Sequence, residues 1–207
     1  MKTGPFERHH ERYDRWFENH EKLYESELEA VRELIPKEGQ GIEIGVGSGR
    51  FSTPLSIEFG LDPSKEMLKL ADERGIRVIR GIGEKLPFKD ESFDFALIVT
   101  TICFFDDPSE ALKETARILK PEGAVVIGFI DKESPLGHIY QKKKDDNVFY
   151  SAAKFFSVEE VIQLLNQVEF SNFSFVQTLF GGIDRASFEK PKKGYDEGSF
   201  VVVSARK

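Results

Sequence analysis

Short apolar runs alternate with amphipathic segments along most of this 207-residue chain. Runs of roughly four to eight apolar residues predict strands, and apolar residues three and four positions apart predict helices. The predicted strands span residues 41–44, 57–61, 76–79, 93–99, 124–130, 172–180 and 199–204. The predicted helices begin after Gly49 and Asp62 and at Asp107 and Ser157. This alternation indicates an α/β protein with a doubly wound sheet of about seven strands, mostly parallel, with an antiparallel last strand.

Two segments fall outside the alternation. Residues 1–35 predict one helix that Pro36 and Gly39 end, because apolar and aromatic side chains recur there every three or four positions. That stripe comprises Tyr13, Trp16, Phe17, His20, Tyr24, Leu28, Val31 and Ile35. Residues 132–156 are rich in polar and aromatic side chains. We expect both segments to gather at the carboxyl ends of the strands, where connecting loops carry binding residues.

The chain is long enough to bury a core of its own, so we expect a single domain over residues 1–207. Its predicted parts are a helical cap, a ligand-binding core, a lid-like insertion, and a C-terminal helix with a strand pair. They span residues 1–38, 39–131, 132–156 and 157–207. Monomer and homodimer both remain open.

Capping signals mark the start of two predicted helices. Asp107 precedes Pro108, and proline suits the first helical position because its missing N–H is not needed there. Ser157 lies three residues before Glu160, which is the spacing of a capping box.

Charge and cysteine content narrow the possible partners. The 29 basic and 36 acidic residues give a net charge of −7, which disfavours nucleic acid because its binding proteins usually carry a basic surface. No apolar stretch approaches the ~18 residues of a membrane span, and no signal segment opens the chain, so we expect a cytoplasmic protein without a membrane partner. Cys103 is the single cysteine and the four histidines lack ligand spacing, so we expect no metal.

A glycine-rich turn follows the first predicted strand. Gly45, Gly47 and Gly49 stand at alternate positions, where glycine lets the chain turn tightly and lets a ligand approach the backbone. Such a loop at the end of a parallel strand typically holds a nucleotide-like ligand. The spacing is G-x-G-x-G, unlike the G-x-G-x-x-G of dinucleotide sites. Asp62 lies 19 positions after Glu43, where a ribose-binding acid is expected at the end of the next strand.

With the loop GIEIGVGSGRF at residues 41–51 and GLDPS at 60–64, the chain resembles the class I S-adenosylmethionine-dependent methyltransferases. The resemblance continues in the same order through GIGEKLPF at 81–88, SFDFALI at 92–98 and RILKPEG at 117–123. It covers roughly residues 39 to 131 and implies a Rossmann-like fold.

The resemblance also implies a donor site for S-adenosylmethionine, with S-adenosylhomocysteine as product. The implied donor-binding residues are Glu43, Gly45, Val46, Gly47, Gly49, Asp62, Pro63, Gly83, Glu84 and Thr100. Two of them have structural alternatives. Glu43 could instead cap backbone N–H groups, and Asp62 could instead be the N-cap of the following helix. If Asp62 binds the ribose, Ser64 could serve as the cap. Ile82 departs from the family, which often has an acid at that position.

The sequence contains no motif that identifies the acceptor. We expect contacts to the acceptor from the helical cap, from the segment after the fourth strand and from the insertion: Tyr13, Trp16, Phe104, Phe105 and Tyr150. His138 and Tyr140 are weak candidates for a general base. The segment after the fourth strand lacks the Asn/Asp-Pro-Pro-aromatic signature of enzymes that methylate DNA bases or glutamine side chains. Cys103 is not expected to be a nucleophile, because direct transfer needs none.

These features predict methyl transfer to a small-molecule acceptor by in-line displacement, catalysed mainly by alignment and exclusion of water. Two alternatives stay open from the sequence. One is a nicotinamide-dependent oxidoreductase, which the glycine spacing and the antiparallel end of the predicted sheet disfavour. The other is a binding module that retains S-adenosylmethionine but has lost the chemistry, since fold does not fix function.

Overall fold

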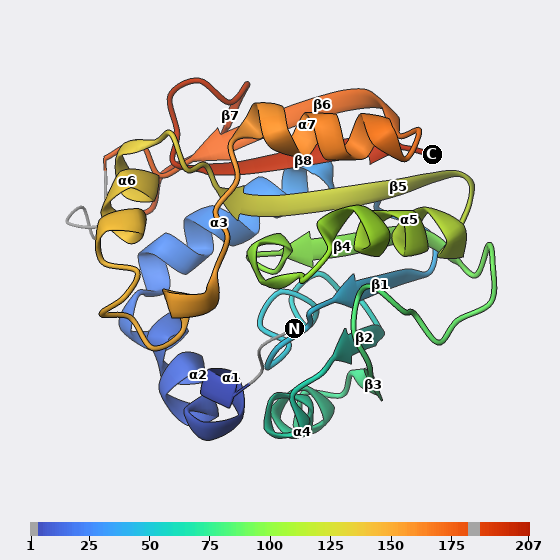
Figure 1. The fold of residues 1–207 in the computed structure, drawn as a ribbon, viewed down its shortest axis with the longest axis horizontal. Coiled ribbons are helices and arrows are strands. Elements are labelled where there is room, and N and C mark those ends of the chain that lie inside the picture. Colours follow the sequence, from blue (N-terminus) through green and yellow to red (C-terminus); the bar gives the residue numbers. More distant parts are fainter. Residues whose placement is uncertain (1–3, 182–186) are drawn as a thin grey trace.

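The computed structural model describes residues 4–181 and 187–207. One eight-stranded sheet runs through it in the order β3-β2-β1-β4-β5-β8-β6-β7 (Figure 1). The strands are β1 (Gly41–Ile44), β2 (Phe59–Asp62), β3 (Arg77–Arg80), β4 (Phe93–Val99), β5 (Leu119–Ile130), β6 (Ser171–Thr178), β7 (Lys192–Lys193) and β8 (Phe200–Arg206). Strands β1 to β5 pair in parallel, while β8 is antiparallel to β5 and β6. The predicted Rossmann-like sheet with an antiparallel last strand is confirmed, and β7 adds a short strand that was not predicted.

The strand order places a topological switch point between β1 and β4. From β1 the chain proceeds outward to β2 and β3, then returns to β4 on the other side and continues to β5. Ligands in open α/β sheets bind at the carboxyl ends of the strands beside such a point. The glycine turn therefore ends β1 at the place where a ligand crevice is expected.

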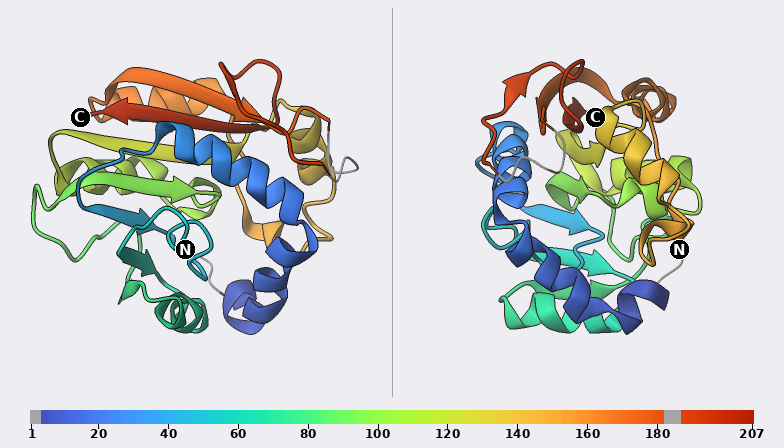
Figure 2. Two further views of the ribbon diagram at one scale, coloured as in Figure 1. Left: turned by 180° about the vertical axis from the view of Figure 1, so that it is seen from behind. Right: turned by 90° about the vertical axis from the view of Figure 1, so that its left-hand side faces the viewer.

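Helices cover both faces of the sheet, as the sequence predicted. Helices α5 (Pro108–Ile118) and α7 (Val158–Gln167) pack on one face, and α3 (Glu21–Leu34) crosses the other (Figure 2). The alternation along β4 shows the two layers, because Ala96 and Ile98 join the first core cluster while Leu97 and Val99 join the second. Helix α4 (Lys65–Glu73) packs beside β2 and β3.

The N-terminal segment differs from the single predicted helix. It forms α1 (Gly4–Arg8), α2 (His10–Asn19) and α3, with breaks at His9 and His20. At the second break His20 leaves helical geometry, with φ of −126°, while its backbone N–H still donates to the Trp16 carbonyl. The prediction was wrong because the aromatic stripe continues without interruption across the break at His20, so the sequence pattern does not show where one helix ends and the next begins.

The helix predicted after Gly49 is also wrong. Residues 50–56 form turns. One helical turn starts, since the Thr53 N–H donates to the Gly49 carbonyl at 3.1 Å. Pro54 has no N–H to continue it, and Ser56 takes a left-handed φ of 57°.

Both predicted caps are confirmed. Asp107 accepts a hydrogen bond from the Glu110 N–H at 3.1 Å, with Pro108 in the first turn of α5. Ser157 and Glu160 form a complete capping box at the start of α7. Helix α5 ends at Ile118, so Leu119 begins β5 instead of extending the helix.

The insertion at residues 132–156 contains α6 (Pro135–Lys142) and a short 3-10 helix, η2 (Tyr150–Ala152). Figures 1 and 2 show α6, α1 and α2 at the same end of the sheet, beyond the carboxyl ends of β1 and β4. The Phe6 and Phe149 rings bring the two segments into contact, with centroids 5.4 Å apart.

Within residues 4–181 and 187–207, no helix combines the length and apolar character needed to cross a bilayer.

Candidate functional site

The three glycines of the turn after β1 have left-handed φ angles of 79°, 52° and 83°, but their surroundings differ. A Cβ on Gly45 would lie 2.2 Å from the Thr101 side chain, and one on Gly49 would lie 2.4 Å from the Ile76 side chain. Packing therefore requires both outer glycines. A Cβ on Gly47 would meet nothing closer than 4.0 Å. The middle glycine consequently presents bare backbone to open space.

Asp62, at the end of β2, holds this turn. Its carboxylate accepts hydrogen bonds from the Gly47 N–H at 3.0 Å and the Ser64 N–H at 2.8 Å. The N-cap of α4 is Ser64, whose hydroxyl oxygen accepts from the Met67 N–H at 3.3 Å. Burial raises the pKa of Asp62 to about 6, and the two backbone N–H groups oppose that rise. Asp62 is therefore not the N-cap of α4.

Glu43 lies on β1 with 2% of its surface exposed. It accepts a hydrogen bond from the Ser52 hydroxyl, and burial raises its pKa to about 8 despite that bond. Together with Gly47 and Thr100 it lines a recess of about 20 Å³. The side chain thus faces the glycine turn from beneath.

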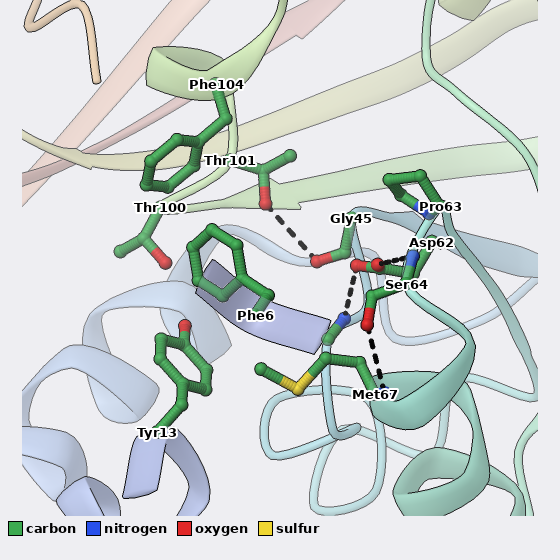
Figure 3. Close-up of a pocket in the computed structure, with 11 residues that line it drawn as sticks. Phe6, Tyr13, Gly45, Asp62, Pro63, Ser64, Met67, Thr100, Thr101 and Phe104 are labelled. Carbon is green, nitrogen blue, oxygen red and sulfur yellow. Dashed lines mark hydrogen bonds between the residues drawn. The ribbon is translucent and has the colours of Figure 1, made fainter. Parts of the chain in front are cut away.

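A cavity that we call the loop cavity opens in front of the turn (Figure 3). Its volume is about 50 Å³. It is lined by Phe6, Tyr13, Gly45, Gly47, Asp62, Pro63, Ser64, Met67, Thr100, Thr101 and Phe104. In Figure 3 the Phe6 ring lies between Gly45, Tyr13 and Met67, in the middle of the cavity. Phe6 was not predicted as a site residue, because one aromatic residue in a five-residue helix produces no periodic signal.

A second and larger cavity, the aromatic cavity, has a volume of about 240 Å³. It is lined by Arg12, Tyr13, Trp16, Phe17, His20, Glu27, Phe51, Thr100, Ile130, Tyr140, Asn147, Phe149 and Tyr150. Tyr140 and Tyr150 stack with centroids 5.1 Å apart, and Phe149 meets Tyr13 edge-on at 5.5 Å. The helical cap and the insertion thus enclose one space between them.

Tyr13 and Thr100 line both cavities and form the boundary between them. Thr100 has a left-handed φ of 49°, which is uncommon for a β-branched residue and indicates local strain. Burial raises the pKa of Tyr13 well above its ordinary value, against a side-chain hydrogen bond with Thr100. The phenol therefore stays protonated at neutral pH.

Glu27 was not predicted as a site residue. It lies on α3, is 6% exposed and lines the aromatic cavity. Burial raises its pKa to about 8. Its charge also raises the pKa of Tyr13, Tyr140 and Tyr150, as expected when the carboxylate lies close to those phenols. Nothing local marks Glu27, since neighbouring positions of α3 carry similar acids.

The sequence and the fold are similar to those of known proteins. A family profile described as "Methyltransferase domain" matches residues 42–127. A solved structure from Thermotoga maritima, described as a SAM-dependent methyltransferase and possible histamine N-methyltransferase, shares 51% identity over 100% of both chains, with a TM-score of 0.97. An uncharacterized protein of Methanocaldococcus jannaschii is 48% identical over 98% of both chains. An uncharacterized protein of Mycobacterium tuberculosis is 35% identical over 93% of this chain and 70% of its own.

The chain belongs to the class I S-adenosylmethionine-dependent methyltransferases. As a member of this family it is an enzyme that uses S-adenosylmethionine as methyl donor. The loop cavity has the chemistry that this donor needs: bare backbone at Gly47, the Asp62 carboxylate beside it and buried Glu43 below. Its volume, however, is below the ~300–1,000 Å³ of typical ligand pockets, because Phe6 lies inside it. These residues fit the donor chemically, while the Phe6 ring occupies part of the space that it would need.

Several predicted site residues of this methyltransferase lie elsewhere. His138 on α6 is exposed, with its Nε2 atom 4.0 Å from the Glu133 carboxylate. Phe105 is buried in the core against Gly83. Glu84 accepts from the Asp106 N–H at 2.8 Å, and its Oε2 is buried without a partner in the described part of the chain. None of these residues lines either cavity, so their roles stay predictions.

Two further predictions concern chemistry. Tyr140 lines the aromatic cavity, but burial raises its pKa well above the ordinary value, so the phenol is a poor base at neutral pH. Burial also raises the pKa of Cys103 to about 12, which disfavours a thiolate. Among the described residues, no three His, Cys, Asp or Glu side chains gather into a group able to hold a metal ion.

Proposed function

We propose that this methyltransferase transfers the methyl group of S-adenosylmethionine to a small-molecule acceptor held in the aromatic cavity. The observation that carries the proposal is the pair of adjoining cavities, which share Tyr13 and Thr100 as their boundary. A donor in the first and an acceptor in the second would meet there. The donor sulfonium supplies the methyl group as an electrophile, so the protein needs mainly to align the acceptor and exclude water.

On the donor side, Asp62 is suited to bind the ribose hydroxyls, because it is a strand-end carboxylate that α4 does not use as its cap. The turn at Gly47 leaves room for the ligand at the backbone. Pro63 lines the same cavity and offers an apolar surface for adenine. Glu43 lies below the turn and is suited to order the methionine end. Gly45 and Gly49 serve by packing, and Val46 is buried among Leu68, Ala71 and Ile76.

On the acceptor side, the aromatic cavity of about 240 Å³ lies between the helical cap and the insertion, and such an enclosed space favours a small molecule. Its walls are largely aromatic, and the chain carries a net charge of −7, which is unfavourable for nucleic acid. The Thermotoga relative's description as a possible histamine N-methyltransferase also favours a small acceptor. A cytoplasmic location stays a prediction.

The family assignment disfavours the nicotinamide-dependent oxidoreductase. The test is calorimetric titration with S-adenosylhomocysteine and NAD, followed by a screen of amines, thiols, phenols and carboxylates for formation of S-adenosylhomocysteine from S-adenosylmethionine. We expect binding of S-adenosylhomocysteine but not NAD, and turnover with one acceptor class. Binding without turnover on any small acceptor would contradict the proposal and favour the non-catalytic module.

A further inference from the structure

The carboxylate of Glu27 is an unpaired acid inside the aromatic cavity. The side chain is 6% exposed, and within the described residues no hydrogen bond or ion pair reaches it. Acidic side chains are rarely buried without a partner, because removing a charge from water costs much more than most single interactions return. A bound cation would provide the missing partner.

The rest of the cavity also suits a cation. Trp16, Tyr13, Tyr140, Phe149 and Tyr150 all line it. Aromatic ring faces attract ammonium groups, and that attraction strengthens when water is excluded. The phenols remain neutral near neutral pH because burial raises their pKa. Glu27 is the one acidic side chain among the cavity's described lining residues.

The two basic residues that line the cavity do not satisfy Glu27. Arg12 is exposed, and its guanidinium lies 5.8 Å from the centroid of the Phe149 ring. His20 stacks on Trp16, and its Nδ1 lies 2.9 Å from the Trp16 carbonyl oxygen. The cavity therefore holds a buried carboxyl group that neither of its basic lining residues pairs with.

We propose that Glu27 selects a protonated small amine as the methyl acceptor and takes its ammonium proton. This inference rests on the proposed function. Glu27 accepts one proton from the ammonium, which leaves a neutral amine and a neutral carboxylic acid in a site that disfavours charge. The nitrogen lone pair then forms the new N–C bond while the C–S bond breaks and its electron pair stays on sulfur. Glu27 lines the aromatic cavity together with Tyr13, which also lines the loop cavity, so an amine bound by Glu27 shares this space with the residue that borders the donor side.

Cavity size limits the amine further. A dry cavity of about 150 Å³ accommodates benzene, so about 240 Å³ leaves room for one ring with a short aminoalkyl chain. We therefore choose 2-phenylethylamine as the probe and 2-phenylethanol, which has nearly the same shape without the charge, as its neutral counterpart.

The experiment measures binding of both probes by calorimetry in the presence of S-adenosylhomocysteine. Wild-type protein should bind the amine more tightly than the alcohol. Glu27→Gln should weaken amine binding by about 10- to 100-fold and leave alcohol binding nearly unchanged, since it removes a charge-assisted contact. Glu29→Gln, on the same helix and paired with Arg32 at the surface, serves as the matched control and should match wild type.

Titration of each variant with S-adenosylhomocysteine alone separates the possible failures. Normal binding by Glu27→Gln shows that the variant folds and that only the acceptor side has changed. If wild type binds S-adenosylhomocysteine yet prefers the alcohol, or if Glu27→Gln retains the amine preference, the amine inference is overturned while the proposed function stands. If wild type does not bind S-adenosylhomocysteine, the proposed function itself fails.

Discussion

The Asp14 carboxylate on α2 lies 2.7 Å from the guanidinium of Arg50, which follows the glycine turn in sequence. The same carboxylate accepts hydrogen bonds from the Ser48 hydroxyl at 2.6 Å and from Arg74 at 2.8 Å. Because Tyr13 is the neighbour of Asp14, this cluster fixes the position of the tyrosine that borders both cavities. The contact joins the helical cap to the glycine turn after β1.

Asp14→Asn should lower the free energy of unfolding by about 1.5–3 kcal/mol at pH 7, the usual scale for hydrogen bonds to a charged group. Burial would raise the pKa of Asp14, but Arg50, Ser48 and Arg74 lower it from 3.8 to about 2. A carboxyl group whose pKa is lowered by folding stabilises the folded state at pH values above its ordinary pKa. For Asp14 this stabilisation is lost as the pH falls through about 2. The difference between variant and wild type in urea unfolding should therefore shrink between about pH 4 and pH 2.

The control for Asp14 is Glu18→Gln, which removes an exposed partner of the same Arg50. Its effect should stay below about 1 kcal/mol, because exposed ion pairs contribute little. Equal losses of unfolding free energy in both variants would mean that burial of the Asp14 cluster does not increase its contribution to stability.

Gly47→Val should abolish S-adenosylhomocysteine binding while the protein remains folded. The new side chain would project into the open space that we assign to the donor. Gly75→Val is the matched control, because Gly75 also has a left-handed φ, 85°, and open surroundings, but lies in the turn between α4 and β3. Both variants should lose about 1–2 kcal/mol of stability from backbone strain. Calorimetric titration should show lost affinity in the Gly47 variant alone.

Asp62→Ala should weaken S-adenosylhomocysteine binding by about 1.5–3 kcal/mol, because it removes a charged hydrogen-bond acceptor. Asp107→Ala removes an acid that does cap a helix, α5, and should instead lower stability by about 1 kcal/mol with affinity unchanged. Measuring affinity and stability on both variants separates the two roles of aspartate. Unchanged affinity in Asp62→Ala would remove Asp62 from the donor site.

The parts of the fold that the sequence predicted are those determined by nearby residues. The start of α5 at Pro108 depends on Asp107, and the start of α7 depends on Ser157 and Glu160, all within four positions. Strand β4 was predicted with its observed bounds, because the apolar run from Phe95 to Val99 is the direct consequence of burial on both faces.

The parts that sequence reasoning missed depend on distant contacts. The bend at His20 lets α2 place Asp14 against Arg50, 36 residues away, and no glycine or proline marks it. Glu27 shares its cavity with Tyr140 and Tyr150, which lie more than 110 positions later in the sequence. The sequence of α3 alone does not distinguish Glu27 from Glu29, which is partly exposed at the surface and paired with Arg32. The sequence therefore did not show that the aromatic cavity contains an acidic side chain.

The stability of the ligand-free enzyme should fall as pH rises from about 4.5 to about 8. Burial raises the pKa of Glu27 and of Glu43 from 4.5 to about 8, so across this window the folded state holds protons that the unfolded state has lost. Each group then reduces the free energy of unfolding by up to ~1.4 kcal/mol per pH unit. Urea unfolding of wild type and Glu27→Gln should show a smaller decline in the variant. Parallel curves would mean that Glu27 does not change its pKa on folding.

The last prediction concerns how the donor enters. The loop cavity of about 50 Å³ is too small for it while the Phe6 ring lies inside, so α1 has to move outward and then close over the bound ligand. Phe6→Ala should therefore increase both the association and the dissociation rate of S-adenosylhomocysteine in stopped-flow experiments, whereas Phe188→Ala, which changes an exposed ring, should alter neither.

Hydrogen exchange tests the same movement without substitution. Saturation with S-adenosylhomocysteine should slow exchange in residues 4–19 and 132–156, because these segments meet through Phe6, Tyr13 and Phe149 and would close together. Helix α7 packs against α5 and lines neither cavity, so its exchange should change little. Two results together would contradict this movement: equal exchange with and without ligand in residues 4–19 and 132–156, and unaltered association and dissociation rates in Phe6→Ala. The helical cap and the insertion would then be rigid, and the donor would reach its site by another route.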